Sequence, residues 1–272
     1  MPELPEVESY RQVATRAVGR RIVAVDSPDA WFLKGGTTAE DLDATLVGGR
    51  FTAARRIGKL LLLDVDGDAS GSGAPSKDAH PVVGIRFGMT GTLLVDGIDD
   101  VGPLLYGPSR RDPAWERWRV VLEGGGTLVV HDPRRLGGVT LDPDTTGLGP
   151  DALTVGSAAL RTATAGSSAP LKAVLLDQSR VAGIGNLIAD ETLWRAGLSP
   201  LRPAASLAAP ESRRLHRHLR ATLADLIQRG GSHRGDLIDE RHPGGCCPKD
   251  GAPLRRATVG GRTTWWCPAH QV

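Results

Sequence analysis

The segment DQSRVAGIGNLIADE, residues 177–191, decides how the second half of the chain is organised. Apolar residues at helical spacing flank its glycine-containing centre, which predicts two helices joined by a tight turn. Gly183 and Gly185 let that turn tighten, and the N–H groups that begin the second helix predict an anion site. Asn186 at this point either caps the helix, its commoner role, or hydrogen-bonds a phosphate. Such a helix-two-turn-helix favours contact with a DNA backbone.

The positive charge of the chain is concentrated around this segment. Residues 151–235 contain 11 Lys and Arg against 6 Asp and Glu, a net charge of +5, whereas residues 1–150 contain 17 against 21, a net charge of −4. A third helix with an apolar face and basic flanks is predicted from Leu215, Leu219, Leu223 and Leu226, with Arg213, Arg214, Arg217 and Arg220. A phosphate-binding surface requires such a basic block; a solvated, arginine-rich helix face is an equal alternative.

Length and composition narrow the class of protein. A chain of 272 residues accommodates two domains and a small appendage. No run of about 18 apolar residues predicts a membrane span, and the acids at positions 3, 6 and 8 argue against a secretory signal peptide. The 3 cysteines all fall in the last 30 residues, so we expect no disulfide framework and a reducing, intracellular setting.

The first half of the chain alternates short apolar runs with turns. Residues 5–18 predict one helix, because their apolar side chains recur at helical spacing. Eight β-type runs follow, at residues 21–25, 50–54, 60–65, 82–86, 92–95, 119–122, 127–131 and 139–141. Many short strands with frequent turns predict a sandwich or barrel. Residues 66–80, rich in Gly, Ser, Ala and Asp, predict a surface loop.

The opening octapeptide MPELPEVE carries candidate chemistry. Removal of Met1 would make Pro2 a terminal amine, and terminal α-amines have a pKa of about 7.7–8.0 against about 10.4 for lysine, so more of the amine is neutral and nucleophilic. Amines form Schiff bases with carbonyl-like carbons, and Glu3 and Glu6 are placed to donate and accept protons. The alternative is that these residues merely start a helix.

Three turns of the first half carry residues suited to nucleic acid. RRIGK, residues 55–59, clusters cations between two strands, which suits either phosphate contact or solubility. RFGMTG, residues 86–91, presents Met89, which on its own would be core filling. HDPRRLG, residues 131–137, presents two arginines and a leucine, the side-chain types that kink and unstack a duplex. An Asp–Arg ion pair is the structural alternative for this turn.

Two pairs of residues near the end of the chain have zinc-ribbon spacing, Cys247 with Asp250 and Cys267 with His270. Histidine is an excellent zinc ligand and aspartate an acceptable one, although structural sites mostly use Cys and His. A hairpin that lacks zinc and packs around its tryptophans is the alternative.

The order of these motifs resembles the formamidopyrimidine-DNA glycosylase/endonuclease VIII family over essentially the whole chain. The start PELPEVE, the RRIGK, GMTG and DPRRLG turns, the DQSRVAGIGNLIADE segment and the terminal hairpin all correspond to family motifs. The start and the DPRR turn look more like the formamidopyrimidine branch. The resemblance implies an α+β multidomain fold: an N-terminal β-sandwich with an N-terminal helix (residues 1–150), a helix-two-turn-helix domain (151–235) and a zinc-finger-like β-hairpin (236–272).

The resemblance also implies an activity, that of a bifunctional glycosylase and AP lyase which flips a damaged base out of double-stranded DNA. The amine of Pro2 would attack the sugar C1′, expel the base and form an imine, while Glu3 protonates the ring oxygen. β- and δ-elimination would then leave a one-nucleotide gap. Glu6 matches a supporting position of this site, and Lys59 matches a lysine that contacts phosphate near the lesion.

Further implied roles concern DNA contacts and a metal. The positions that grip phosphate match Lys172, Asn186 and Arg262. The positions that fill the void left by the flipped nucleotide match Met89, Arg134 and Leu136. One structural Zn²⁺ would be held by Cys247, Asp250, Cys267 and His270. The expected protein is a monomer of the bacterial cytoplasm, associated with the nucleoid and not with a membrane.

Four departures from the family pattern qualify these implications. Arg86 stands where histidine is common, and Leu136 stands where phenylalanine is common and would stack. The metal quartet is altered. The stretch between Gly231 and Cys247 is much shorter than in typical 8-oxoguanine-excising members, which carry a lesion-covering loop there. We therefore expect weaker selection for 8-oxoguanine than for ring-opened purines, abasic sites or oxidised pyrimidines.

The competing hypothesis is a non-catalytic binder of damaged DNA with the same fold. The presence of Pro2, Glu3 and Glu6 argues against it. A weaker alternative assigns the basic helices to RNA or protein interaction.

Overall fold

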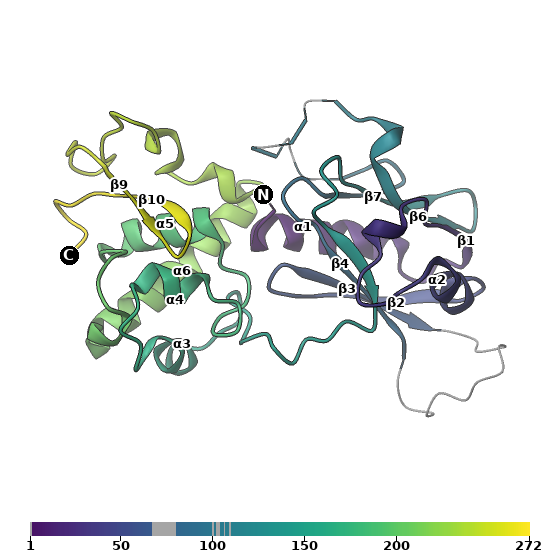
Figure 1. Cartoon of the computed structure of the whole chain (residues 1–272), viewed down its shortest axis with the longest axis horizontal. Coiled ribbons are helices and arrows are strands. Elements are labelled where there is room, and N and C mark those ends of the chain that lie inside the picture. Colours follow the sequence, from purple (N-terminus) through teal and green to yellow (C-terminus); the bar gives the residue numbers. More distant parts are fainter. Residues whose placement is uncertain (1, 67–79, 100, 102–103, 106, 109) are drawn as a thin grey trace. The chain divides into compact units, whose positions relative to one another are not determined.

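The computed structural model describes residues 2–66, 80–99, 101, 104–105, 107–108 and 110–272 (Figure 1). The chain divides into two compact units, residues 1–2 with 6–145 and residues 3–5 with 146–272. The loop predicted at residues 66–80 lies outside the described residues except at its two ends. In the described part of the chain, no helix has the length and apolar character needed to cross a membrane.

The first unit contains two four-stranded antiparallel sheets, with strand orders β1-β6-β7-β5 and β2-β3-β4-β8. All eight predicted β-type runs are strands. Their bounds are β1 (Ile22–Asp26), β2 (Arg50–Ile57), β3 (Leu60–Asp66), β4 (Val82–Arg86), β5 (Thr92–Val95), β6 (Glu116–Leu122), β7 (Thr127–His131) and β8 (Gly138–Leu141).

The helix predicted near the start of the chain is α1 (Leu4–Ala14), extended by the 3₁₀ turn η1 (Thr15–Ala17). Its predicted apolar face is fully buried, at Val7, Tyr10, Ala14 and Ala17. The helix α2 (Ala39–Leu46) was not predicted, although a capping box of Thr38 and Asp41 marks its start. Two further 3₁₀ turns are η2 (Ala30–Phe32) and η3 (Pro113–Trp115).

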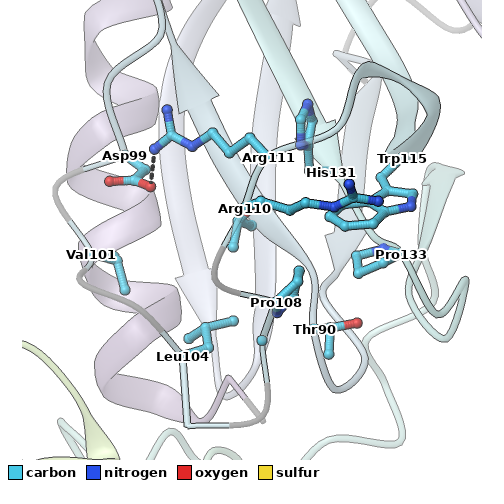
Figure 2. Close-up of a pocket in the computed structure, with 12 residues that line it drawn as sticks. Thr90, Asp99, Val101, Leu104, Pro108, Arg110, Arg111, Trp115, His131 and Pro133 are labelled. Atoms are coloured by element: carbon cyan, nitrogen blue, oxygen red, sulfur yellow. Dashed lines mark hydrogen bonds and ion pairs between the residues drawn. The ribbon is translucent and has the colours of Figure 1, made fainter.

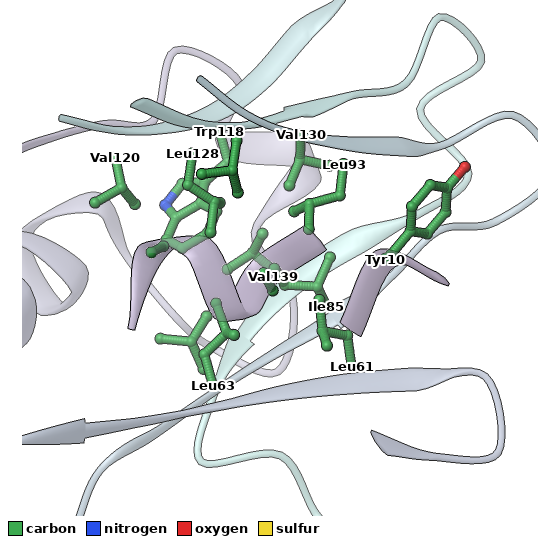
Figure 3. Packing of buried hydrophobic residues seen from close by; sticks show 14 of the residues in the cluster. Tyr10, Leu61, Leu63, Ile85, Leu93, Trp118, Val120, Leu128, Val130 and Val139 are labelled. Carbon is green, nitrogen blue, oxygen red and sulfur yellow. The ribbon is translucent and has the colours of Figure 1, made fainter. Parts of the chain in front are cut away.

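The core of the first unit lies between its two sheets (Figure 3). Alternation along the strands supplies it: in β6, for example, Trp118, Val120 and Leu122 are buried and their neighbours are partly exposed. Side chains of one sheet, Leu61, Leu63, Ile85 and Val139, face those of the other, Leu93, Trp118, Val120, Leu128 and Val130. The predicted β-sandwich is confirmed.

The second unit is helical, with a hairpin at its end. Its α-helices are α3 (Ser157–Thr164), α4 (Leu171–Leu176), α5 (Asn186–Ala196) and α6 (Ala209–Gln228). Its 3₁₀ turns are η4 (Ala204–Ser206), η5 (Ser232–Arg234) and η6 (Ile238–Glu240). The four predicted leucines of α6 are buried, whereas Arg213, Arg217 and Arg220 on the same helix are exposed.

The hairpin consists of β9 (Arg255–Val259) and β10 (Arg262–Trp266). It is joined to α5 by the Trp265 N–H, which donates to Asp190 on that helix. A small cluster of Trp194, Leu237, Cys247 and Cys267 forms a satellite core. Helices, antiparallel sheets and hairpin together confirm the α+β multidomain class, while the limits of the three domains stay a prediction.

Candidate active site and nucleic-acid interface

Glu3 lies at the N-terminus of α5, and its side chain is 1% exposed. Its two carboxylate oxygens accept the Leu187 and Ile188 N–H groups at 3.0 and 3.1 Å. Gly185 permits this approach, because a Cβ there would lie 2.1 Å from the Glu3 carboxyl carbon. A helix N-terminus stabilises an anion through its unpaired N–H groups and its dipole.

This contact corrects one prediction. The anion site expected at the start of α5 exists, but the Glu3 carboxylate of the chain itself fills it, so those N–H groups are not available to a phosphate. The sequence could not show this, because the two partners are separated by 184 residues.

Pro2 immediately precedes Glu3 and is buried. It lies outside α1, which begins at Leu4, so helical hydrogen bonding makes no use of the Pro2 nitrogen. Pro5 and Glu6 occupy the first turn of α1, where proline and acids are favoured. The helix-start interpretation therefore describes residues 4–6 correctly, and Pro2 lies outside it.

Lys59 lies in the turn between β2 and β3, and a buried ion-pair network braces that turn. Glu8, on α1, accepts Arg56 Nε at 3.0 Å and Arg11 at 2.7 Å. Arg56 also donates to the Gly58 carbonyl at 2.9 Å. Burial alone would raise the pKa of Glu8, but the two guanidinium groups outweigh it and lower that pKa. Glu8 thus positions the Lys59 turn, a role that the sequence did not suggest.

A fully buried carboxylate joins the GMTG turn (residues 88–91) to the DPRRLG turn (residues 132–137). Asp132 Oδ1 accepts the Thr90 hydroxyl at 2.7 Å, and Asp132 Oδ2 accepts the Gly137 N–H at 2.8 Å. Because these hydrogen bonds are buried, the loss of one leaves a costly unpaired group. The two turns therefore form one rigid element.

The backbones of these turns also touch. Gly88 has a φ of 56°, and a Cβ on it would lie 2.4 Å from the Leu136 carbonyl carbon, so only glycine fits. Beside it, Arg135 pairs with both oxygens of Asp29 at 2.6 and 2.7 Å. The Asp–Arg ion pair that was the structural alternative for this turn is therefore present, but only at Arg135.

The remaining side chains of the two turns are presented to solvent. Leu136 is 52% exposed, Arg134 is exposed and Met89 is half-buried. The structure therefore brings together the three residues predicted to fill the space left by a flipped nucleotide. An exposed leucine that directly follows two arginines is a suitable wedge for a base step.

A cavity of about 310 Å³ lies behind these turns, with Thr90 and Pro133 in its wall (Figure 2). The Arg110 guanidinium stands 5.4 Å from the centre of the Trp115 ring, and His131 also lines the cavity. The sequence did not predict it, because the lining comes from segments far apart in the chain.

Lys172 is fully buried, in contrast to the prediction of a phosphate contact. Its ammonium forms an ion pair with Asp190 Oδ1 at 2.7 Å, and it donates to the Thr264 hydroxyl at 2.7 Å and the Thr263 carbonyl at 3.2 Å. Burial lowers the pKa of Lys172, and the Asp190 carboxylate partly offsets this. The contacts link α4, α5 and β10. Lys172 therefore braces these three elements, and the direct phosphate contact, which stays a prediction, would require its buried ion pair with Asp190 to open.

The other two predicted phosphate ligands, Asn186 and Arg262, are less buried than Lys172. Asn186 is the first residue of α5, after the capping position, and its buried side-chain oxygen has no hydrogen-bond partner among the residues that the structure describes. Capping is therefore not its role. Arg262 is exposed at the start of β10, and exposed Arg255 and Arg256 lie on β9.

The four predicted metal ligands, Cys247, Asp250, Cys267 and His270, converge, with one ligand atom of each within 4.8 Å of the others. The Cys247 Sγ–His270 Nδ1 distance is 3.6 Å and the shorter Cys267 Sγ–Asp250 distance is 3.3 Å. A tetrahedral ion with bonds of about 2.0–2.3 Å has ligand separations of roughly 3.3–3.8 Å, so this spacing fits.

The surroundings of the quartet fit a metal as well. His270 Nε2 lies 3.1 Å from the Trp194 carbonyl, which leaves Nδ1 for the metal, as is usual for ligating histidines. The Lys249 N–H and the Trp194 indole N–H both point at the Cys247 sulfur, as outer hydrogen bonds to a metal ligand do. The Ala252 N–H and the His270 ring hold the pKa of Asp250 far below its usual range.

Comparison with known proteins gives a consistent result. The family model for the N-terminal domain of formamidopyrimidine-DNA glycosylase matches residues 1–139, and that for its H2TH domain matches residues 147–236. The formamidopyrimidine-DNA glycosylase of Methylococcus capsulatus is 34% identical, with both chains covered completely.

Solved structures show the same likeness. The structure of the MutM (Fpg) protein from Thermus thermophilus is 32% identical with a TM-score of 0.74, covering 99% of this chain and 98% of that one. A mutant Fpg from Lactococcus lactis in complex with DNA containing Fapy-dG is 25% identical with a TM-score of 0.78, and 99% of each chain is covered.

The buried brace around Asp190 predicts an asymmetric loss of stability. Asp190→Asn removes the charge shared by Lys172 and Arg241 and should cost about 3–5 kcal/mol in urea unfolding. Lys172→Met should cost less, because Arg241 still pairs with Asp190. The exposed control Arg213→Ala should stay within about 0.5 kcal/mol of the parent. A cost for Asp190→Asn no larger than that of the control would contradict the brace.

Proposed function

Because the chain belongs to the formamidopyrimidine-DNA glycosylase family, we propose that it is a bifunctional DNA glycosylase and AP lyase. Its substrates are oxidised bases in double-stranded DNA, namely ring-opened purines and also oxidised pyrimidines or 8-oxoguanine. The supporting observation is the start of the chain, where buried Pro2 directly precedes Glu3, whose carboxylate is fixed by two N–H groups. We propose further that the protein acts as a monomer.

The chemistry follows from these two residues. With Met1 removed, the Pro2 nitrogen attacks C1′ of the damaged nucleoside, and the base leaves with its bonding electron pair. The Glu3 carboxylate takes the proton that the attacking amine loses and delivers it to the ring oxygen, so that the sugar opens and an iminium ion joins C1′ to Pro2. Loss of a proton from C2′ then expels the 3′ phosphate by β-elimination, and δ-elimination expels the 5′ phosphate. Glu6 and Lys59 are proposed to support this site and to hold the phosphate near the lesion.

The DNA grip is divided among described surface residues. Arg262 and Asn186 are proposed to hold phosphates from the second unit, which carries the basic block. The exposed tip formed by Met89, Arg134 and Leu136 is proposed to fill the space that the flipped nucleotide leaves. Cations at the surface make such binding sensitive to salt.

The covalent step predicts trapping of the imine. Borohydride reduction in the presence of abasic-site DNA should give a stable protein–DNA adduct, which Pro2→Gly reduces or abolishes. Glu3→Gln keeps the shape of the side chain but cannot deliver a proton, so base excision should fall by about 10²–10⁴-fold. Leu201→Ala, at an exposed position of the second unit with no proposed contact to DNA, serves as the control. A wild-type protein that binds lesion DNA but gives no adduct would favour the non-catalytic binder.

The short stretch after α6 predicts the order of substrates. The carboxylate of Glu191 holds this stretch in place by accepting the Asp236 and Leu237 N–H groups at 3.1 and 3.0 Å. The chain also passes close to this carboxylate, because a Cβ on Gly235 would collide with it. No lesion-covering loop fits into such a stretch. Without a loop to contact the lesion, kcat/KM for 8-oxoguanine should lie roughly tenfold below that for a ring-opened purine, the equivalent of about 1.4 kcal/mol. A panel of lesion duplexes that ranks 8-oxoguanine first would overturn this.

The quartet around Cys247 is proposed to hold one structural Zn²⁺, which would cross-link the hairpin to the segment that precedes it. Elemental analysis of purified protein should find about one zinc per chain, and Asp250→Ala should lower that content. Chelation should lower the melting temperature of the parent more than that of Asp250→Ala. Purified protein without metal, whose melting temperature chelators do not change, would support the zinc-free hairpin.

A further inference from the structure

Trp31 is 67% exposed, although the next residue, Phe32, is completely buried. Both belong to η2, which turns one aromatic ring into the sandwich core and the other out to solvent. Tryptophan is normally highly buried, because its ring offers a large apolar area. An outward indole on a short, well-anchored turn therefore suggests a binding surface.

The indole is held in place by two neighbours. Asp29 accepts the Trp31 N–H at 3.2 Å and so fixes the start of η2. The Lys34 ammonium lies 4.5 Å from the centre of the Trp31 ring, within range of a cation–π interaction, and donates to the Trp31 carbonyl. The ring is thereby ordered before any partner arrives, which lowers the entropy cost of binding.

The same aspartate connects Trp31 with the DPRRLG turn. Both Asp29 oxygens accept the guanidinium of Arg135, the residue between Arg134 and Leu136. Behind this ion pair, a Cβ on Gly138 would lie 2.5 Å from Lys34 Cγ, so the two segments are in close contact. Trp31 and the exposed tip of the turn consequently belong to one continuous, rigid surface.

The charge on this surface is positive. Asp29 is neutralised by Arg135 and lies 3.6 Å from Arg117. Among the residues that the structure describes, no carboxylate lies within ion-pair distance of Lys34 or Arg134. An exposed aromatic ring beside such cations suits a nucleic-acid strand, in which every base offers a face for stacking and every nucleotide a phosphate.

We propose that Trp31 is an additional DNA-contact residue, whose indole stacks on a nucleoside of the strand next to the DPRRLG turn while Lys34 faces that nucleoside's phosphate. This inference rests on the proposed function, since it presupposes that the DPRRLG turn faces DNA. The contact tolerates any base, because stacking depends on the π-face and not on the hydrogen-bonding edge.

The test is a titration of a duplex that carries a tetrahydrofuran abasic-site analogue, followed by fluorescence anisotropy. Trp31→Leu should raise Kd by about 5- to 150-fold, the range expected for one lost stacking contact, and Trp31→Phe should retain most of the affinity. Leu201→Ala, which truncates an apolar side chain that is 42% exposed in the second unit, is the control and should bind like the parent.

The salt dependence separates stacking from charge. Trp31→Leu should leave the slope of log affinity against log salt unchanged, whereas Lys34→Gln should reduce the slope by about one. A reduced slope for Trp31→Leu would overturn the stacking role, because the ring would then act only by holding Lys34. Equal affinities of Trp31→Leu and the parent would also overturn it.

Two further measurements distinguish a failure of the Trp31 proposal from a failure of the proposed enzyme function and from self-association. Borohydride trapping at saturating protein should proceed normally in Trp31→Leu, so failure of the parent to form the adduct would count against the enzyme and not against Trp31. Sedimentation of the free protein tests whether the surface around Trp31 binds a second copy of this chain instead of DNA. Self-association that Trp31→Leu abolishes, with DNA affinity unchanged, would assign the ring to a protein interface and overturn the proposal.

Discussion

The chemistry proposed for this protein depends on one electrostatic contact, the Glu3 carboxylate held by the first N–H groups of α5. A buried carboxylate is stable only where donors or positive charge compensate it, and a helix N-terminus provides both. The contact fixes a side chain that would otherwise be part of a mobile chain end. Because Pro2 is bonded directly to Glu3, its nitrogen is restrained as well. An imine-forming enzyme requires its nucleophile and its acid to be held in place together, which are the roles proposed for these two residues.

A second constraint of the same kind orders the surface of the first unit. Asp132 ties the GMTG turn to the DPRRLG turn, and Asp29 ties the DPRRLG turn to Trp31. In both cases the oxygens of a buried or nearly buried carboxylate accept protein donors, while the exposed side chains next to it are left for a partner. Kinking a duplex costs free energy, so the groups proposed to do it must themselves be rigid.

The sequence predicted the elements better than it predicted the contacts. Alternating burial is a local property, so strands such as 127–131 and the leucine face of α6 could be inferred from spacing alone. The metal quartet was also predicted correctly as a spatial cluster, because pairs of ligands at fixed spacing imply a hairpin.

The partners of single charged groups could not be predicted from the sequence. Lys172 lies in a basic block like a phosphate ligand, yet Asp190 and Thr264 enclose it, and Glu3 fills the anion site predicted for DNA. Such pairings join residues far apart in the chain, and residue type alone does not specify them. Trp31 was missed because the exposure of an aromatic residue depends on the turn that carries it.

The central claim, that the Pro2 nitrogen is the nucleophile, is tested most directly by locating the covalent bond. After borohydride trapping on abasic-site DNA, tryptic digestion and mass spectrometry should find the deoxyribose remnant on the peptide of residues 2–11, attached at Pro2 and without Met1. A remnant on Lys59 or on any other lysine, or an adduct formed by protein that retains Met1, would contradict the account.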